Sequence, residues 1–182
     1  MIAEAEDQLE KSDGRRLVLS ELATRVGMSQ SYVHTFYPTK ADLVRALAAK
    51  WFEDVEAASR QAVKDDAEAT IRLEKWVLSI LQIKRRRFDA NPKLFSAYLE
   101  LASQHMDLVQ AHVAKLRQDL TSIVCDMAPK QDVDGTVLLI ENATLLFRTP
   151  QNIATYRERA TDEAAIAICD ILIGKLASSQ KR

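Results

Sequence analysis

The side chains best suited to chemistry in this sequence are four polar residues at the start of one predicted helix. Gln30, Ser31, Tyr32 and His34 follow directly after Ser29, and each carries an amide, hydroxyl or imidazole group. Such groups donate or accept hydrogen bonds at the edges of DNA bases, and the amide of a glutamine can bind adenine through two bonds. A helix enters the major groove most closely when its leading side chains are short or polar. This arrangement therefore favours recognition of DNA over catalysis.

Two short helices separated by a tight turn are predicted to position these side chains. Apolar residues recur at helical spacing from Leu19 to Val26, which predicts the first helix. Gly27 stands where a left-handed residue would end that helix. Ser29 fits the N-cap of the second helix, whose inner face is expected to consist of Val33, Phe36 and Tyr37.

A long helix is predicted to follow at once. Pro38 stops the preceding helix, and Thr39 starts the next with Asp42 three residues on, in the arrangement of a capping box. Apolar residues at helical spacing continue to about Lys64. This helix should act as a rigid connection between an N-terminal module and the rest of the chain.

The segment LSELATRVGMSQSYVHTFYPTKADL resembles the DNA-binding signature of TetR-type repressors. The matching features are Leu22-Ala23, Gly27, Ser29, Phe36-Tyr37, Pro38-Thr39-Lys40 and Leu43. The resemblance implies that base edges are met by Gln30, Ser31, Tyr32 and His34, and that the phosphate backbone is held by Tyr37, Thr39 and Lys40. The match covers the first quarter of the chain, and the helical pattern of the remainder fits the ligand-binding and dimerisation domain of that family.

Some features depart from this resemblance. His34 stands where the family usually has tyrosine, and Val18 replaces a common Thr or Ser cap, which should weaken that helix start by about 1 kcal/mol. The segment from Met1 to Lys50 holds seven Lys or Arg and seven Asp or Glu residues. Its neutrality argues mildly against tight non-specific binding to DNA.

The whole chain is predicted to be all-α, with about nine helices. Only four glycines and four prolines occur in 182 residues, which favours long helices. Beyond the long helix, the predicted helices span about Ala67–Asp89, Pro92–Ser103, Met106–Met127, Val133–Phe147, Gln151–Arg159 and Asp162–Ala177, with breaks that include Ala128-Pro129-Lys130. We expect a helix-turn-helix DNA-binding domain in residues 1–50 and a helical bundle for ligand binding and dimerisation in residues 51–182.

Candidate ligand-binding residues of the second domain are large or polar, although an ordinary core would contain the same types. They are Trp76, Ile80, Phe95, Tyr98, Leu99, His112, Leu116 and Asn142. By resemblance, the two last long helices form the dimer interface as a four-helix bundle, through Leu138, Leu145, Leu146, Ala165, Ile168, Cys169, Leu172 and Leu176. A dimer would place two recognition helices about one DNA turn apart, as a palindromic operator requires.

Three further features have simpler interpretations. The basic run Lys84-Arg85-Arg86-Arg87 reads as a solvated helix end, although it could instead contact phosphates or clamp the two domains together. Cys125 and Cys169 are expected to be buried free thiols. His105 and His112 lie seven residues apart and lack the spacing of a metal site, so neither a metal nor another cofactor is expected.

The sequence excludes several classes of protein. The net charge is −1, no apolar run approaches the length of a membrane span, and the acidic start is unlike a signal peptide, so a cytoplasmic protein is expected. No phosphate loop or nucleophile motif predicts an enzyme.

The expected function is transcriptional regulation, as a repressor that binds an operator as a homodimer and is released by a small-molecule effector. The alternatives are a DNA-binding dimer without a ligand and a helical interaction protein that has lost DNA binding.

Overall fold

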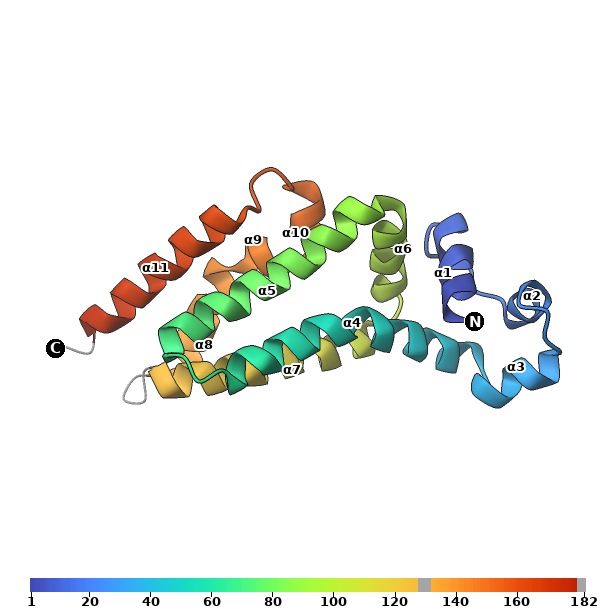
Figure 1. Ribbon diagram of the computed structural model, residues 1–182, viewed down its shortest axis with the longest axis horizontal. Coiled ribbons are helices and arrows are strands. Elements are labelled where there is room, and N and C mark those ends of the chain that lie inside the picture. The colour runs from blue at the N-terminus through green and yellow to red at the C-terminus, as the bar shows by residue number, and fades with distance from the viewer. Residues whose placement is uncertain (128–131, 180–182) are drawn as a thin grey trace. The chain divides into compact units, whose positions relative to one another are not determined.

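The computed structural model describes residues 1–127 and 132–179, and these residues form helices joined by short turns (Figure 1). The helices are α1 (Ile2–Lys11), α2 (Leu19–Arg25), α3 (Gln30–Phe36), α4 (Lys40–Lys64), α5 (Ala69–Ala90), α6 (Pro92–Ser103), α7 (Met106–Met127), α8 (Val133–Ala143), α9 (Leu145–Arg148), α10 (Pro150–Thr155) and α11 (Asp162–Ser179). Nine of them have seven or more residues, so the predicted all-α fold is confirmed. The break expected at Ala128-Pro129-Lys130 lies outside the described residues.

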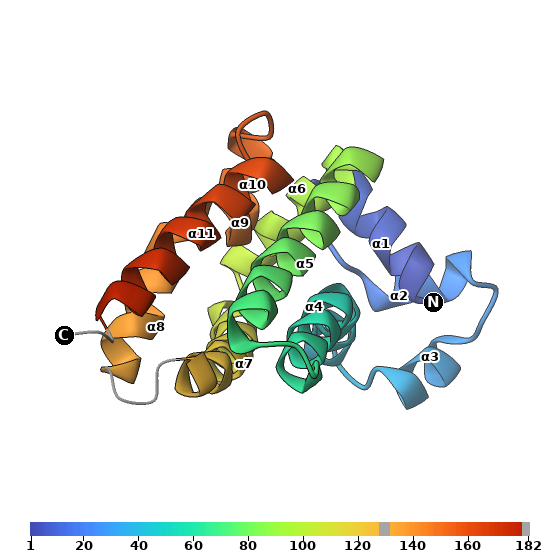
Figure 2. The same ribbon diagram turned by 60° about the vertical axis from the view of Figure 1, so that its left-hand side comes forward.

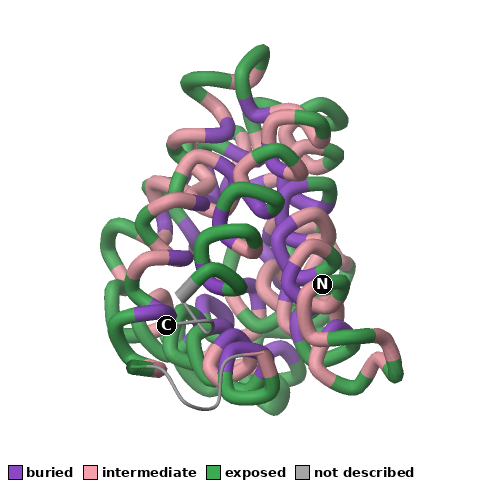
Figure 3. The backbone as a smooth tube through the Cα atoms, turned by 90° about the vertical axis from the view of Figure 1, so that its left-hand side faces the viewer, coloured by how far each residue is buried: buried purple, intermediate pink, exposed green. Residues whose placement is uncertain are grey.

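The chain forms two compact units. The first unit contains residues Met1–Glu53 and Asp89–Ala111, and the second contains Asp54–Phe88 and His112–Arg182. The helices α4 and α7 each contribute to both units. Each unit has its own apolar core, and buried stretches alternate with exposed ones along the helices (Figure 3). This alternation is the expected result of an apolar stripe on each amphipathic helix.

The core of the first unit joins α1, α2, α3, α6 and the first half of α4. Its members include Leu9, Leu22, Val33, Leu43 and Leu47, which are all completely buried. The helix α6 belongs to this unit although some fifty residues of chain separate it from α3. An aromatic group reinforces the packing: the Trp51 ring stacks on that of Tyr98, with centroids 4.0 Å apart.

The turn after α1 is held closely against α6. Gly14 has a φ of +83°, and a Cβ atom there would lie 2.3 Å from the carbonyl oxygen of Ala97. Only glycine fits this position, because any other residue would combine an unfavourable backbone conformation with a clash against a helix backbone. The turn after α1 therefore packs against α6 backbone to backbone at one point.

The second unit contains α5, α8 to α11 and the remaining parts of α4 and α7. Figures 1 and 2 both draw α5 beside α11, and a hydrogen bond of 2.7 Å joins Gln82 on α5 to Asp162 at the start of α11. The residues Trp76, Ile80, Leu120, Ile123 and Ile140 fill the centre of its core.

The structure corrects the single helix predicted from Val133 to Phe147. The helix is interrupted at Thr144, between α8 and α9. The buried hydroxyl of Thr144 donates a bond of 2.6 Å to the carbonyl oxygen of Ile140 and accepts one of 2.8 Å from Nε of Arg148. A threonine hydroxyl that bonds the preceding turn competes with the helical pattern, and neither glycine nor proline marks the position.

The expectation that both cysteines are buried is correct for one of them and wrong for the other. Cys169 is buried, and burial raises the pKa of its thiol to about 12. Cys125 is exposed, because it lies on the outer side of α7 while its neighbours Ile123 and Val124 fill the core.

In the part of the chain that the structure describes, no helix has the length and apolar character needed to cross a membrane.

Candidate nucleic-acid interface and the interior of the second unit

The helices α2 and α3 are joined by a tight turn with the predicted capping. Gly27 has a φ of +67° and donates its N–H to the carbonyl oxygen of Thr24 at 3.2 Å. Ser29 is the N-cap of α3, and its hydroxyl accepts a bond of 3.2 Å from the N–H of Tyr32. These local bonds end one helix and start the next within three residues, which fixes the direction of α3 against α2.

The turn between α3 and α4 is also closed by side chains. The carboxylate of Asp42 accepts bonds from the Thr39 backbone N–H at 2.9 Å and from its hydroxyl at 2.7 Å. These two bonds hold the pKa of Asp42 below its ordinary value. Nδ1 of His34 lies 3.1 Å from the carbonyl oxygen of Pro38 and must carry the proton of that bond. Lys40 is the first residue of α4 and is exposed beside this turn.

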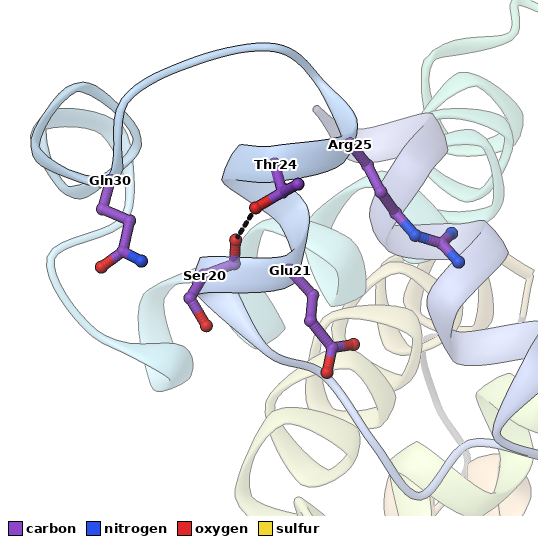
Figure 4. A pocket seen from close by; sticks show the side chains of 5 residues that line it. All are labelled: Ser20, Glu21, Thr24, Arg25 and Gln30. Carbon is purple, nitrogen blue, oxygen red and sulfur yellow. Dashed lines mark hydrogen bonds between the residues drawn. The ribbon is translucent and has the colours of Figure 1, made fainter.

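The seven residues predicted to contact DNA come together around α3 and the start of α4. Gln30, Ser31, Tyr32, His34, Thr39 and Lys40 are exposed, and Tyr37 is half-buried against the core of the first unit. Gln30 also lines a surface hollow with Ser20, Glu21, Thr24 and Arg25 of α2, and Figure 4 shows Gln30 and Ser20 on opposite sides of it. The structure thus brings the predicted polar set together on one surface.

Phe36 is a residue of this surface that the sequence analysis misplaced. It was expected on the inner face of α3, but its side chain is 51% exposed. Its ring lies edge-on against that of Tyr32, with centroids 5.2 Å apart. The spacing of four residues between the two rings could have indicated a shared outer face. The two adjacent aromatic rings of Tyr32 and Phe36 therefore lie on the exposed face of α3.

Most cations of the first unit are neutralised by carboxylates nearby. Arg25 lies 2.7 Å from Glu4 and 2.5 Å from Asp7. Four other cations, Lys11, Arg16, Arg45 and Lys50, also have a carboxylate partner. Among the residues of this unit that the structure describes, Arg15, Lys40 and Lys93 have no such partner, and all three are exposed. The neutral composition of this segment therefore conceals an uncompensated cation at the start of α4.

The start of α2 is stabilised in a different way from the usual cap. Val18 supplies no side-chain bond there, as expected from the sequence. Instead, the amide of Gln8 on α1 accepts a bond of 3.1 Å from the Val18 N–H and donates one of 3.4 Å to its carbonyl oxygen. A side chain from a neighbouring helix thus holds the backbone of the N-cap residue itself.

The basic run at the end of α5 is not a solvated helix end, so that interpretation is wrong. Lys84 is buried and donates a hydrogen bond to the carbonyl oxygen of Arg148. Arg85 pairs with Asp162 at 2.6 Å, and Arg87 pairs with Asp54 at 2.8 Å. Only Arg86 of the four is exposed. The three other side chains contribute to the packing of the second unit.

His112 lies in a buried polar group of the second unit. Its Nδ1 donates a hydrogen bond of 3.0 Å to the carboxylate of Glu56. The same carboxylate also accepts a hydrogen bond of 2.9 Å from Lys115. Burial lowers the pKa of His112 to about 4, although the bond to Glu56 acts in the opposite direction. Burial also opposes ionisation of Glu56, but the two hydrogen bonds bring its pKa below the ordinary value. At neutral pH the pair is therefore a neutral imidazole bonded to a carboxylate.

Comparison with known proteins identifies the family. A family model described as tetracycline repressor-like, C-terminal domain, matches residues 69–169, which is more than half of the chain. The chain belongs to the tetracycline repressor-like family. No curated protein matches it. The family assignment thus rests on the C-terminal part, whereas the TetR-type resemblance in the sequence lies in the N-terminal part, and the two agree.

The residues predicted to line a pocket in this TetR-like chain are divided between the units. Trp76, Ile80, His112 and Leu116 are buried in the second unit. The remaining predictions lie elsewhere: Phe95 and Tyr98 are buried in the first unit, Leu99 is half-buried there, and Asn142 is exposed on α8. Lys84 and Arg148 were not predicted as pocket residues, because nothing in a local pattern indicates that Lys84 bonds the Arg148 backbone or that Arg148 approaches Trp76.

The residues predicted for dimerisation also have different environments. Ala165, Cys169, Leu172 and Leu176 of α11 are buried in the core of this protomer, and Leu146 and Ile168 are half-buried. Leu138 and Leu145 are exposed, at 51% and 49%. Ile171 on α11 was not predicted and is 66% exposed. Because α11 is apolar around most of its circumference, periodicity did not reveal which face is turned inward.

Proposed function

We propose that this TetR-like regulator binds a palindromic operator as a homodimer, acts as a repressor and is released by a small-molecule effector. The observation that carries the DNA-binding part is the exposed polar start of α3, held between the capped turn at Gly27 and Ser29 and the capping box at Thr39. Exposed side chains on rigid elements suit readout of base edges, because little conformational freedom is lost on binding. The exposed ammonium group of Lys40 at the start of α4 suits a phosphate.

In the proposed complex, the residues of the interface have separate roles. Gln30, Ser31, Tyr32 and His34 face base edges, and Tyr37, Thr39 and Lys40 face the phosphate backbone. The exposed ring of Phe36 is suited to apolar contact with a thymine methyl group. With Nδ1 of His34 bonded to Pro38, its Nε2 remains as an acceptor.

This assignment is tested by selecting a preferred duplex from a random library and measuring its affinity by fluorescence anisotropy. Gln30→Ala should weaken binding to that duplex by about 1–3 kcal/mol and relax the preference at one position of each half-site. Arg86→Ala, which removes an exposed charge from α5, is the matched control and should retain the preference. An unchanged base preference for Gln30→Ala would remove α3 from the proposed contact set.

We infer that dimerisation uses apolar residues that are exposed on α8, α9 and α11. They are Leu138, Leu145 and Ile171. This set refines the sequence-based one, because residues that fill the core of the protomer cannot also meet a second copy. A cyclic dimer would place the same helices of both chains in one four-helix arrangement.

The oligomeric state tests this surface directly. Ile171→Asp should shift the protein from dimer to monomer in sedimentation velocity, because it places a charge in an apolar interface. Val113→Asp is the matched control, since Val113 is also exposed, at 48%, but lies on α7. Dissociation by both variants, or by neither, would argue against the proposed surface.

The proposed release by an effector uses α4. This helix runs without a break from Lys40 to Lys64 and contributes to both units. An effector that binds one conformation of the second unit more tightly would shift the population of α4 orientations and so the operator affinity. A regulator without an effector would show the same operator affinity under all ligand conditions.

A further inference from the structure

The interior of the second unit contains a lysine without an acidic partner. Lys84 on α5 is 9% exposed, and its ammonium group donates a hydrogen bond to the carbonyl oxygen of Arg148. Among the residues that the structure describes, no carboxylate lies within ion-pair distance of Lys84. A buried charge normally requires a counter-charge, because desolvation of an ammonium group costs several kcal/mol. Lys84 therefore lacks the interaction that its position calls for.

A second cation lies next to it and also lacks an acid. The guanidinium carbon of Arg148 is 5.3 Å from the centre of the Trp76 ring. Its hydrogen bonds go to neutral oxygens, the Thr144 hydroxyl at 2.8 Å and the Glu141 carbonyl at 2.9 Å. The carboxylate of Glu141 pairs with Arg117 instead, at 2.5 Å. These two bonds thus orient the Arg148 side chain without neutralising its charge.

The other charged groups around this pair do not compensate for it. Arg87 on α5 adds positive charge and is paired with Asp54 of α4. His112 of α7 is neutral, and its partner Glu56 of α4 also binds Lys115. Burial, then Arg148 and Arg87, lower the pKa of Lys84 to about 7. A local excess of positive charge therefore remains between α5 and α9.

Apolar core residues also lie beside the two cations. Trp76, Ile80, Ile83 and Phe147 belong to the core of the same unit, and Ile80 lies one helical turn before Lys84. A ligand suited to these surroundings needs one anionic group that two cations can bind and an apolar body. A dianion such as phosphate would need more donors than this apolar region supplies.

We propose that Lys84 and Arg148 bind the anionic group of the effector, and that the effector is an organic monocarboxylate with an apolar body. This inference rests on the proposed function, in which the second unit senses a small molecule. The carboxylate would accept hydrogen bonds from both side chains, and its apolar body would lie among the core residues near Trp76. Binding would also keep Lys84 protonated at a pH at which the free protein partly releases that proton.

Isothermal titration calorimetry of the full chain tests the inference with octanoate and benzoate, and with octanol, benzyl alcohol and inorganic phosphate for comparison. At pH 7 at least one of the two carboxylates should bind at least tenfold more tightly than its alcohol, and phosphate should not bind. Lys84→Met should reduce carboxylate affinity at least tenfold, whereas Arg86→Met should retain it. At pH 8, titrations in buffers of different ionisation enthalpy should reveal proton uptake by the wild-type chain.

Several results would overturn the inference. These are no binding of either carboxylate, equal binding of carboxylates and alcohols, preferential binding of phosphate, or full carboxylate affinity in Lys84→Met. If Lys84→Met does not fold, Arg148→Met and the proton uptake of the wild-type chain give the same test. Because these titrations contain no DNA, Lys84-dependent binding of a carboxylate would stand even if operator binding failed. An operator affinity unchanged by a bound carboxylate would refute effector release alone.

Discussion

The two units of this TetR-like protein differ in where their unpaired cations lie. In the first unit, five of the seven cations from Lys11 to Lys50 form exposed pairs with carboxylates, and Lys40 remains unpaired at the surface. In the second unit, Lys84 is buried and Arg148 is half-buried, and both bond neutral oxygens. An exposed free cation suits a polyanion that arrives from solvent, whereas a buried one suits a small anion that enters the core.

The largest expected effect concerns the rigid frame of the first unit. Gly14→Ala should lower the free energy of unfolding by about 2–4 kcal/mol. The added methyl group is disfavoured in the left-handed backbone conformation of this residue, and it would also clash with the Ala97 carbonyl oxygen. Gly27→Ala is the matched control: Gly27 is also left-handed, but nothing lies within 4 Å of an added Cβ, so the cost should be about 1 kcal/mol. Urea denaturation compares the two variants, and equal losses would contradict the close packing of α1 and α6.

The second expected effect concerns the buried charge. Lys84→Met should raise the free energy of unfolding by about 1–3 kcal/mol at pH 6, because it removes an unpaired charge from an apolar core. The folded pKa of Lys84 is about 7, below that of the unfolded chain, so the charge costs most below pH 7 and less as the pH rises. The advantage of the variant over the wild type should therefore shrink between pH 7 and 9, by up to about 1.4 kcal/mol per pH unit.

The exposed neighbour Arg86 is the control for this experiment. Arg86→Met should change the free energy of unfolding by less than about 0.5 kcal/mol, with no change in its dependence on pH. A Lys84→Met variant that is less stable than the wild type at pH 6 would show that Lys84 is compensated in the folded protein. The contrast between the units would then be lost.

The local structure of the first unit was predictable because its signals lie within a few residues of one another. Ser29, and Thr39 with Asp42, cap the helices that the sequence predicted them to start. Gly27 has the predicted left-handed conformation. Each of these features depends on a bond between near neighbours in the chain, so the residue type and its spacing are sufficient evidence.

Features that depend on distant contacts were not predictable in the same way. The burial of Lys84 depends on α9, which lies more than sixty residues later in the chain. The end of α8 depends on a threonine that only its buried bonds distinguish from an ordinary helical residue. The inward face of α11 depends on which of several apolar faces meets the core. Local patterns contain none of this information.

Lys40 offers a sharp test of whether α3 and the start of α4 form the DNA-binding surface. The measurement is the dependence of operator affinity on salt concentration for the wild type, Lys40→Ala and Arg86→Ala. Lys40→Ala should weaken binding to all duplexes to a similar degree, by up to about 1 kcal/mol, and should reduce the magnitude of the slope of log affinity against log salt by about 1. Arg86→Ala should leave the slope unchanged. An unchanged slope for Lys40→Ala would exclude the start of α4 as a phosphate contact.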